Sequence, residues 1–321
     1  MMKMRVGVLR GGPSAEYDVS LKSGQAVLDA LPAEQYDLAD IYIDRSGTWH
    51  FRGRPVEPHR AFDQIDVIFN ALHGRYGEDG TVQRLLDTHG VPYTGSDALG
   101  SAIGMHKALA KGLLKDHSVL LAHHRVLVQD DLSEAFLREL WTTFPQPSVV
   151  KPLDGGSSVA TAVVRTFDEL LFTLLEAFKE SEKVLIEQYL KGREATVAVV
   201  EGFRGEPYYA LPPIEIVPTK NSFFDYAEKY AGFAREICPA PFPRETTFAL
   251  EEAARDIHQT LGLRDYSRSD FIVRPEGLFF LEVNTLPGLT PASLVPKAVE
   301  SVGGNLSGFL AHLVDRAAAR I

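Results

Sequence analysis

The amino-acid sequence predicts an α/β protein that begins with a doubly wound α/β domain. Regions of antiparallel sheet follow, so the chain as a whole is α+β. In the first hundred residues, short apolar runs alternate with helix-like segments, as parallel strands alternate with crossover helices. From about residue 104, strand-like runs follow one another around short turns, which is typical of antiparallel hairpins. A chain of 321 residues with 45% hydrophobic content also predicts two or three domains.

The first unit combines three strand-like runs with two helical patterns. The strands are expected at residues 6–9, 37–43 and 66–72. Gly11 and Gly12 lead from the first strand toward a helix at residues 20–31, and a second helix at residues 81–89 is stopped by Gly90. This order predicts a small doubly wound domain.

The central region predicts a small antiparallel sheet with covering helices. Strands are expected at residues 148–151, 159–164, 184–190 and 194–201, with a glycine-serine turn between the first two. A helix follows the second strand, because Thr166 and Glu169 have the spacing of a capping box.

The last region predicts a helix at residues 244–261, stopped by Gly262, and then a hairpin. Its strands, residues 266–273 and 278–284, flank a turn at residues 274–277. We therefore expect three units, with boundaries at residues 1–103, 104–190 and 191–321.

Composition limits the compartment and the partners. A single cysteine, Cys238, excludes an intramolecular disulfide framework and a cysteine zinc cluster, so a cytoplasmic location is expected. The sequence shows neither a signal-peptide pattern nor a membrane-length apolar run. A net charge of −10 argues against non-specific binding to nucleic acid, so anionic ligands must be held by local charges.

The predicted hairpin places acidic and basic side chains on one face. Period-two alternation puts Arg268 and Asp270 on one face of the first strand, and Glu282 and Asn284 on one face of the second. Two carboxylates and an amide oxygen then converge, and these are ligands suited to Mg²⁺. The alternative is a half-buried hairpin whose charged residues face solvent. The opposite, core-like face is expected to carry Phe271, Phe279 and Leu281.

A second pattern is a lysine at a strand end followed by a glycine-serine turn. Lys151 precedes Gly155, Gly156, Ser157 and Ser158, whose N–H groups and hydroxyls could cover phosphates. An ordinary hairpin turn explains the glycines equally well. The sequence has no Walker A pattern and no suitable dinucleotide fingerprint, which excludes a P-loop site and argues against an oxidoreductase with a Rossmann site.

Glu187 and Glu194 lie on either side of a strand break at residues 191–192. A carboxylate here could bind ribose hydroxyls while the neighbouring backbone pairs with adenine. The alternative is a pair of exposed glutamates at strand ends.

These three patterns occur in the order seen in ATP-grasp enzymes, and five further segments resemble the D-alanine:D-alanine ligase family. The resemblance runs over nearly the whole chain. The segments are GGPSAEYDVSLKSG (11–24), NALHGRYGEDGT (70–81), MHKALAK (105–111), FFDYAEKY (223–230) and NTLPGLTPASLVPK (284–297). The resemblance implies that an N-terminal substrate domain precedes a two-lobed ATP-grasp fold.

In this family, ATP phosphorylates the carboxylate of one D-alanine, and the amine of a second D-alanine attacks the acyl phosphate to give D-alanyl-D-alanine for peptidoglycan precursors. The resemblance implies two Mg²⁺ ions, with Mn²⁺ as an alternative, held by Asp270, Glu282 and Asn284. It places the ATP phosphates at Lys107, Lys151, Ser157 and Ser158, the transferred phosphate at Lys229, adenine near Glu187 and Leu190, and the ribose at Glu194.

The resemblance also assigns the substrate residues. Arg268 and the Gly288 N–H would stabilise the phosphoryl group and the oxyanion. Glu16 would bind the ammonium of the first D-alanine, linked through Ser157 to Tyr230, with His73 nearby. Ser293 and the backbone near Leu294 would bind the second carboxylate.

Simpler explanations exist for several of these residues. Glu16 could be a first-turn helix carboxylate, Tyr230 an ordinary amphipathic aromatic and His73 a structural loop histidine. Lys107, one helical turn from Lys111, could belong to a solvated helix face.

Several positions depart from the family pattern. His106 stands where Asp is common, Tyr17 where a charged residue or His is common, and Ala160 where Gly usually closes the serine loop; Ser267 and Ser269 are also unusual. Ala160 matters most if its backbone requires positive φ.

Two other functions are compatible with the sequence. The first is a ligase with D-lactate or D-serine as acceptor, although Tyr230 favours an amine nucleophile. The second is a catalytically silent nucleotide-binding protein, against which the intact metal, arginine and lysine positions argue. The family resemblance also implies a homodimer.

Overall fold

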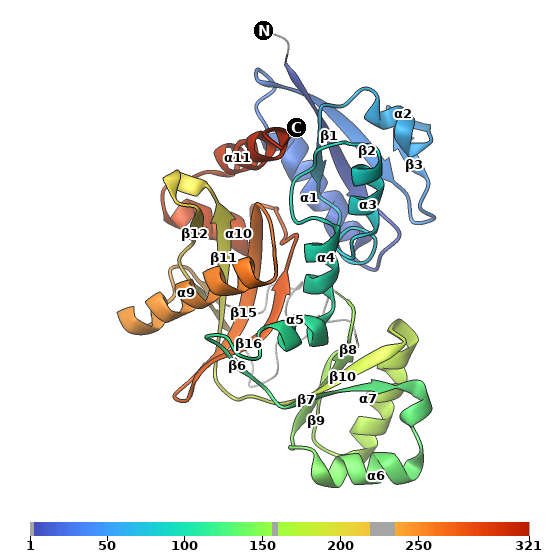
Figure 1. Ribbon diagram of the computed structural model, residues 1–321, viewed down its shortest axis with the longest axis vertical. Helices are drawn as coiled ribbons and strands as arrows, with labels where there is room; N and C mark the ends of the chain where they lie inside the picture. Colours follow the sequence, from blue (N-terminus) through green and yellow to red (C-terminus); the bar gives the residue numbers. More distant parts are fainter. Residues whose placement is uncertain (1–2, 156–159, 219–234, 321) are drawn as a thin grey trace.

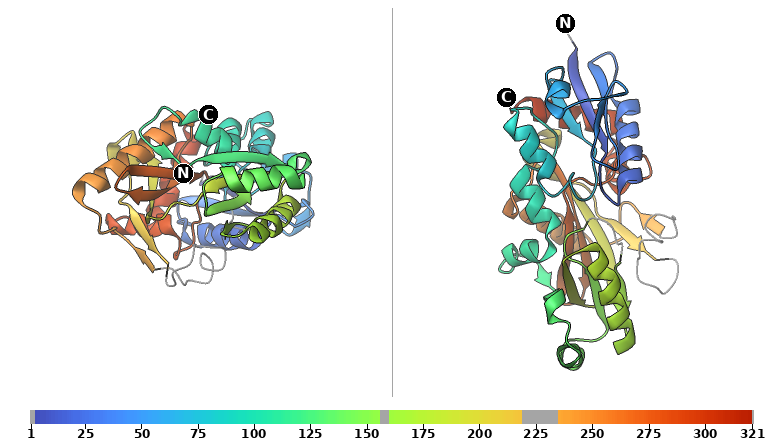
Figure 2. Two further views of the ribbon diagram at one scale, coloured as in Figure 1. Left: turned by 90° about the horizontal axis from the view of Figure 1, so that it is seen from below. Right: turned by 90° about the vertical axis from the view of Figure 1, so that its right-hand side faces the viewer.

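The computed structural model describes residues 3–155, 160–218 and 235–320. Three sheets follow one another along the longest axis of an elongated molecule (Figure 1), and both chain ends lie at the N-terminal sheet. Figure 2 shows from two further directions that helices flank these sheets. Within the described residues, no helix is long and apolar enough to cross a membrane.

The N-terminal sheet has the order β4-β3-β2-β1-β5. Its strands are β1 (Met4–Gly11), β2 (Tyr36–Ile43), β3 (Trp49–Phe51), β4 (Arg54–Pro55) and β5 (Val67–Asn70). β1 pairs in parallel with both β2 and β5, whereas β3 and β4 form an antiparallel edge. The helices of this region are α1 (Tyr17–Ala30), α2 (Pro58–Phe62) and α3 (Thr81–Thr88).

Apolar side chains cover both faces of this sheet. On one face, Val6 of β1 packs with Val27 of α1 and with Leu313 of the C-terminal helix α11 (Leu306–Ala318). On the other, Ile41 of β2 packs with Leu86 of α3. The predicted doubly wound arrangement is confirmed, and the last helix of the chain completes it (Figure 1).

The central sheet has the order β7-β10-β8-β9 and is antiparallel throughout. Its strands are β7 (His124–Val128), β8 (Ser148–Pro152), β9 (Ala162–Val164) and β10 (Lys183–Gln188). The helices α6 (Glu134–Thr143) and α7 (Phe167–Glu180) share an apolar cluster with it. The predicted capping box is present, because Thr166 and Glu169 each accept from the other residue's backbone N–H.

The third sheet has the order β14-β13-β11-β15-β16-β6, with β12 also paired to β11. Its strands are β6 (Leu120–Leu121), β11 (Arg193–Glu201), β12 (Tyr208–Ala210), β13 (Ile214–Val217), β14 (Arg235–Ile237), β15 (Tyr266–Arg274) and β16 (Gly277–Asn284). The helix α9 (Arg244–Thr260) packs on β11 and β12 through residues such as Leu250 and Ile257.

The expectation that residues 194–201 belong to the small central sheet is wrong, because β11 pairs with β13 and β15. The chain passes between the two sheets at Gly192. A Cβ atom there would lie 2.4 Å from Ile272 Cγ2 and 2.7 Å from the Val273 carbonyl oxygen. A glycine therefore lets the connection lie directly against β15.

The β15–β16 hairpin confirms the predicted opposition of acidic residues and corrects the predicted core face. Asp270 lies directly opposite Glu282, and the register then shifts so that Phe271 pairs with Phe280. Phe280, rather than Phe279 or Leu281, packs with Phe271 in the core. The register shift leaves Leu281 as the extra residue, which re-aims the side chains next to it.

The remaining elements connect the sheets. They are α4 (Ala98–Met105), α5 (Lys107–Leu113), α10 (Leu294–Ser301) and the short 3₁₀ turns Gln129–Asp131 and Phe203–Gly205. α5 lies between the central sheet and β16 (Figure 1).

Candidate functional site

A cavity of about 790 Å³, here called the central cavity, brings together side chains from the central sheet, the third sheet, and the α1 helix and loops next to the N-terminal sheet. Every predicted site residue within the described part of the chain lines it. These residues are Glu16, His73, Lys107, Lys151, Glu187, Leu190, Glu194, Arg268, Asp270, Glu282, Asn284, Gly288, Ser293 and Leu294. The predicted residues Ser157, Ser158, Lys229 and Tyr230 lie outside the described residues.

The hairpin wall of this cavity is a set of paired charges. The Arg268 guanidinium donates from Nε and Nη2 to the two Asp270 carboxylate oxygens, each at 3.0 Å. Thr196 Oγ1 donates to Asp270 at 2.5 Å, and Asn284 Nδ2 donates at 3.1 Å. Arg268 and Asp270 are both buried. The alternative that this acidic face is solvated is therefore wrong.

The donor set of the hairpin fits a hard divalent cation. Asp270 and Glu282 are opposite one another, and Asn284 adds an amide group to the same face. The cations Arg268 and Lys107 now balance the carboxylates, with Lys107 Nζ 3.5 Å from Glu282 Oε2. Among the described residues no three His, Cys, Asp or Glu side chains form a metal cluster. Substrate oxygens or water would therefore have to complete the coordination shell.

Lys107 projects from the first turn of α5. Its Nζ donates to the Gly155 carbonyl oxygen at 2.6 Å. Lys107 and Lys111 are both buried, so the expectation of a solvated helix face fails. The start of the helix is fixed by His106, whose Nδ1 accepts from Leu109 N–H at 3.1 Å. His106, which stands where Asp is common, thus supplies the N-cap acceptor of this helix.

Glu187 lies between two lysines. Its Oε1 lies 2.7 Å from Lys111 Nζ, and its Oε2 lies 2.8 Å from Lys151 Nζ. Burial opposes ionisation of this carboxyl, but the two ammonium groups outweigh it and lower the pKa of Glu187 to about 2. Glu187 lies next to the end of β10 but is buried, so the alternative of an exposed glutamate is wrong for this residue. Lys111 was not predicted as a site residue, because sequence alone does not show that it is buried.

Glu194 and Leu190 lie on the part of the wall between the central sheet and the third sheet. Glu194 is in β11, opposite Ile216 of β13, and is partly exposed to the cavity. Leu190 follows β10 and is buried. These two residues precede and follow Gly192, where the chain passes from the central sheet to the third sheet.

The opposite end of the cavity is formed by the start of α1 and the loop after β5. Glu16 is the N-cap residue of α1 and makes no side-chain cap hydrogen bond to that helix. A Cβ atom on Gly74 would lie 3.2 Å from Glu16 Oε1, so the carboxylate lies directly against the loop.

Glu78 is a buried carboxyl in this loop that the sequence analysis missed. It accepts from Gly74 N–H at 2.7 Å and from Leu286 N–H at 3.0 Å. Burial and the nearby Glu16 charge raise the pKa of Glu78 to about 8, against the effect of the backbone donors. Its position inside the segment NALHGRYGEDGT was a signal that could have identified it.

His73 is buried beside Glu78 and shares a 2.7 Å hydrogen bond with Ser23 Oγ through Nε2. Burial lowers the pKa of His73 to about 4. The imidazole is therefore neutral at pH 7, which suits a hydrogen-bonding role rather than a charged one.

The segment before α10 closes this end of the cavity. Ser293 is the N-cap residue of α10, and its Oγ lies 2.8 Å from Thr290 Oγ1. A Cβ atom on Gly288 would lie 2.9 Å from Ser293 Oγ, so a larger residue at 288 would require the Ser293 side chain to shift. Helix N-termini of this kind favour a carboxylate.

The unusual residues have structural explanations in most cases. Ala160 has φ +54°, so this position does require the left-handed backbone that favours glycine. Tyr17 hydrogen-bonds Tyr42, and its ring faces the Arg45 guanidinium at 4.1 Å. Ser267 Oγ bonds His258 Nδ1 at 2.7 Å. Nothing in the structure explains Ser269, whose hydroxyl is buried without a partner among the described residues.

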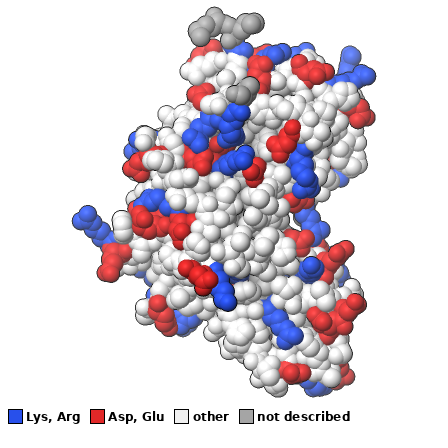
Figure 3. All heavy atoms as spheres, in the orientation of Figure 1, with Lys and Arg blue, Asp and Glu red and all other residues white. Residues whose placement is uncertain are grey.

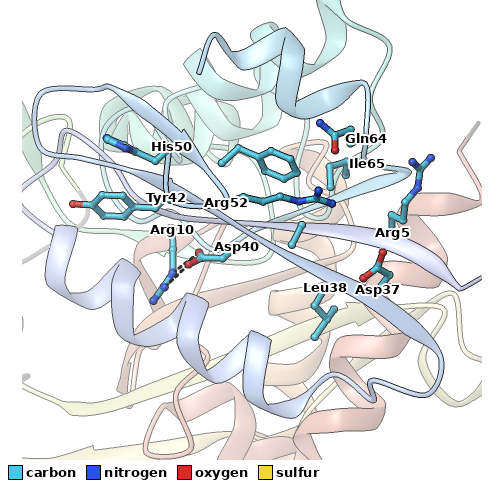
Figure 4. A pocket seen from close by; sticks show the side chains of 13 residues that line it. Arg5, Arg10, Asp37, Leu38, Asp40, Tyr42, His50, Arg52, Gln64 and Ile65 are labelled. Atoms are coloured by element: carbon cyan, nitrogen blue, oxygen red, sulfur yellow. Dashed lines mark hydrogen bonds and ion pairs between the residues drawn. The ribbon is translucent and has the colours of Figure 1, made fainter. Parts of the chain in front are cut away.

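A second cavity, of about 640 Å³, lies beside β2 and the β3–β4 turn (Figure 4). Two of its three arginines are balanced locally, because Arg10 forms a fork with Asp40 and Arg5 pairs with Asp66. None of the predicted site residues lines it. Basic and acidic side chains are likewise interspersed over the face of the molecule in Figure 3. The central cavity is therefore the better candidate site.

Comparison with known proteins shows which protein family this chain is similar to. A family model of the D-ala D-ala ligase N-terminus matches residues 5–59 and 53–96, and a family model of the D-ala D-ala ligase C-terminus matches residues 113–315. A D-alanine–D-alanine ligase from Geotalea uraniireducens is 41% identical over 99% of this chain and 96% of its own. One from Halalkalibacterium halodurans is 41% identical over 94% of each chain.

Solved structures show the same likeness. The VanG D-Ala:D-Ser ligase from Enterococcus faecalis has a TM-score of 0.86 at 30% identity, covering 98% of this chain and all of that one. The D-alanine–D-alanine ligase from Coxiella burnetii has a TM-score of 0.85 at 26% identity, covering all of this chain and 95% of that one.

Proposed function

The chain belongs to the D-alanine–D-alanine ligase family, and on that premise we propose that the central cavity joins two D-alanines at the expense of ATP. One observation carries the proposal. The same cavity holds buried lysines and a carboxylate hairpin at one end, and a carboxylate, a neutral histidine and a helix N-terminus at the other. The first set suits a nucleotide polyphosphate, and the second suits amino-acid ammonium and carboxylate groups.

At the nucleotide end, Lys107 and Lys151 bind the ATP phosphates. Glu187 and Leu190 lie on the side of the adenine ring, and Glu194 accepts from the ribose hydroxyls. The buried position of both lysines supports this assignment, since their charges are only weakly screened by water. Ser157, Ser158 and Lys229, outside the described residues, remain predicted phosphate contacts.

Asp270, Glu282 and Asn284 would hold two Mg²⁺ ions. Bound there, the ions supply neutralisation of the charge on the phosphates during phosphoryl transfer. Arg268 pairs with Asp270 and lines the same cavity. Its fork of donors stabilises charge on the transferred phosphoryl group.

At the amino-acid end, Glu16 binds the ammonium group of the first D-alanine, and neutral His73 donates or accepts a hydrogen bond without competing for that charge. The carboxylate of this D-alanine takes the phosphoryl group from ATP, which gives D-alanyl phosphate and ADP. The Ser293 hydroxyl and the backbone at Leu294 hold the carboxylate of the second D-alanine. Its amine attacks the acyl carbon, the Gly288 N–H and Arg268 stabilise the oxyanion, and phosphate leaves.

Further parts of the proposal concern the whole protein. We place the enzyme in the cytoplasm, as a homodimer supplying peptidoglycan precursors, with units at residues 1–103, 104–190 and 191–321. The predicted link from Glu16 through Ser157 to Tyr230 would close the cavity over the acyl phosphate and keep water away.

The test is a measurement of phosphate release with ATP and Mg²⁺, with D-alanine, L-alanine, D-serine or D-lactate added alone or together with D-alanine. Release that requires D-alanine and yields D-alanyl-D-alanine by mass is the expected result. A second candidate is ligation of D-alanine to D-serine, since VanG, which is similar over 98% of this chain, is a D-Ala:D-Ser ligase. A mixed product alone would favour this second candidate. ATP binding without any release would contradict catalysis.

A further inference from the structure

Lys111 carries a fully buried charge behind the wall of the central cavity. It lies in α5 one turn after Lys107 and is 0% exposed. Its Nζ lies 2.7 Å from Glu187 Oε1 and donates to the Phe280 carbonyl oxygen at 2.9 Å. A buried ion pair is weak evidence for stability, because an apolar pair of similar volume often does as well. The role of this lysine therefore lies in the geometry that it fixes.

Lys111 holds one side of a row of three charges. Glu187 offers one carboxylate oxygen to Lys111 and the other to Lys151, whose Nζ lies 2.8 Å away. Lys151 lines the cavity, and Lys111 is buried behind it. With Lys111 in place, Glu187 has only one oxygen for Lys151. The Lys151 ammonium, which has three donors, therefore keeps capacity for a group inside the cavity.

Lys111 also joins the two sheets on either side of the nucleotide end. Glu187 belongs to β10 of the central sheet, and Phe280 belongs to β16 of the third sheet. α5 lies between them (Figure 1), and a single ammonium group bonds to both. The contact holds the two sheets together beside the part of the cavity that Lys151 of β8 and Glu282 of β16 line.

We propose that Lys111 is a positioning residue for nucleotide binding, acting through Glu187 on Lys151 without touching the nucleotide. The proposal rests on the function proposed above. Lys111 is expected to affect the binding of ATP and not that of D-alanine, because its contacts lie at the nucleotide end of the cavity.

The test compares Lys111→Met with wild type by calorimetric titration of ADP with Mg²⁺, without D-alanine, and by steady-state kinetics. We expect the Kd for ADP and the KM for ATP to rise about tenfold or more, which corresponds to about 1.4 kcal/mol, while the KM for D-alanine stays within about twofold. The matched control is Lys115→Met, an exposed lysine one turn further along the chain, which should leave all three values unchanged.

An unchanged ADP affinity in folded Lys111→Met, or equal increases in the KM values of ATP and D-alanine, would overturn the proposal. If Lys111→Met does not fold, Glu187→Gln is compared with the double variant Lys111→Met/Glu187→Gln, which lacks both charges. We expect the same ADP affinity in these two, because Lys111 acts through Glu187. Further weakening of about threefold in the double variant would overturn the proposal. A wild-type chain that binds no ADP would contradict the proposed function before any variant is compared.

Discussion

The two ends of the central cavity keep buried ionisable groups in opposite states. At the end formed by Lys111, Lys151 and Glu187, the groups are ionised and paired, and the pKa of Glu187 falls to about 2. At the end formed by His73 and Glu78, burial holds both groups neutral near pH 7, with pKa values of about 4 and 8. Burial disfavours charge at both ends, and only the presence of opposite charges at close range reverses it.

This difference follows from the ligands proposed for each end. A polyphosphate requires fixed positive charge, and a row of lysines needs an internal anion to remain ionised without water. A small zwitterion requires one carboxylate for its ammonium group, and further charges near Glu16 would bind the wrong ions. With His73 and Glu78 neutral, we propose that the Glu16 carboxylate selects the ammonium group.

The largest effect is expected from Glu187→Gln, which removes the anion between the two lysines. Leaving buried ammonium groups without their partner should lower the free energy of unfolding by about 3–5 kcal/mol. Because the folded pKa of Glu187 lies below the ordinary 4.5, the stability it contributes is present above about pH 4.5 and is lost as pH falls toward 2. Urea unfolding at pH 7 and pH 3 measures both effects. Exposed Glu276→Gln is the control, and a loss below 1 kcal/mol at pH 7 in Glu187→Gln would contradict the ionised triad.

The next effect concerns the hairpin between the two ends. Arg268→Lys keeps the charge but loses the two parallel bonds to Asp270, so kcat should fall by about 10²–10³-fold while ATP affinity changes little. Steady-state assays of phosphate release measure kcat, and titration with ADP measures the affinity for the nucleotide. Arg264→Lys, at an exposed arginine paired with Asp97, should change neither. Weaker ATP binding with an unchanged kcat would mean that Arg268 only positions the nucleotide.

The neutral end makes a prediction about pH. Between about pH 6.5 and pH 4, an unfolded chain protonates His73 and the folded protein does not, so the stability that His73 contributes falls as the pH falls through this window. Glu78, whose folded pKa of about 8 lies above its ordinary 4.5, acts in the opposite direction. The contribution of His73 is about 3 kcal/mol over the full window. His73→Gln should remove this dependence in urea unfolding at several pH values, whereas exposed His59→Gln should not. An unchanged slope in His73→Gln would show that His73 titrates normally.

The sequence predicted those parts of the site that depend on local periodicity. Alternation placed Asp270 opposite Glu282, and the Thr166 and Glu169 spacing predicted the capping box. It failed where a residue's surroundings come from distant segments. Strand period identifies β11 as a strand but not its partners, and the extra residue at Leu281 breaks the alternation on which the core face was predicted.

Burial explains the residues that the sequence missed. Lys111 looks like a solvated helix lysine until β10 and β16 enclose it, and Glu78 gains its neutral state only from the packing of residues 285–286 against its loop. The α11 helix likewise covers a sheet formed some three hundred residues earlier in the chain. These are tertiary effects, which no window of local sequence contains.

The smallest predicted effect lies in the turn that follows Lys151, and it tests whether the charged end is also strained. Ala160 adopts φ +54°, a backbone region that costs a non-glycine residue about 1 kcal/mol or more. Ala160→Gly removes that cost but gives the unfolded chain more freedom, so the net gain in the free energy of unfolding should be at most about 1 kcal/mol. Ala162→Gly, two residues on in β9, has no such strain to relieve and should lose about 0.5–1 kcal/mol. Urea unfolding measures the stability of both variants, and the KM for ATP is measured alongside. Equal losses of stability in both would show that the positive φ at Ala160 stores no strain. A gain only in Ala160→Gly would show that the backbone at this position is strained when it carries alanine.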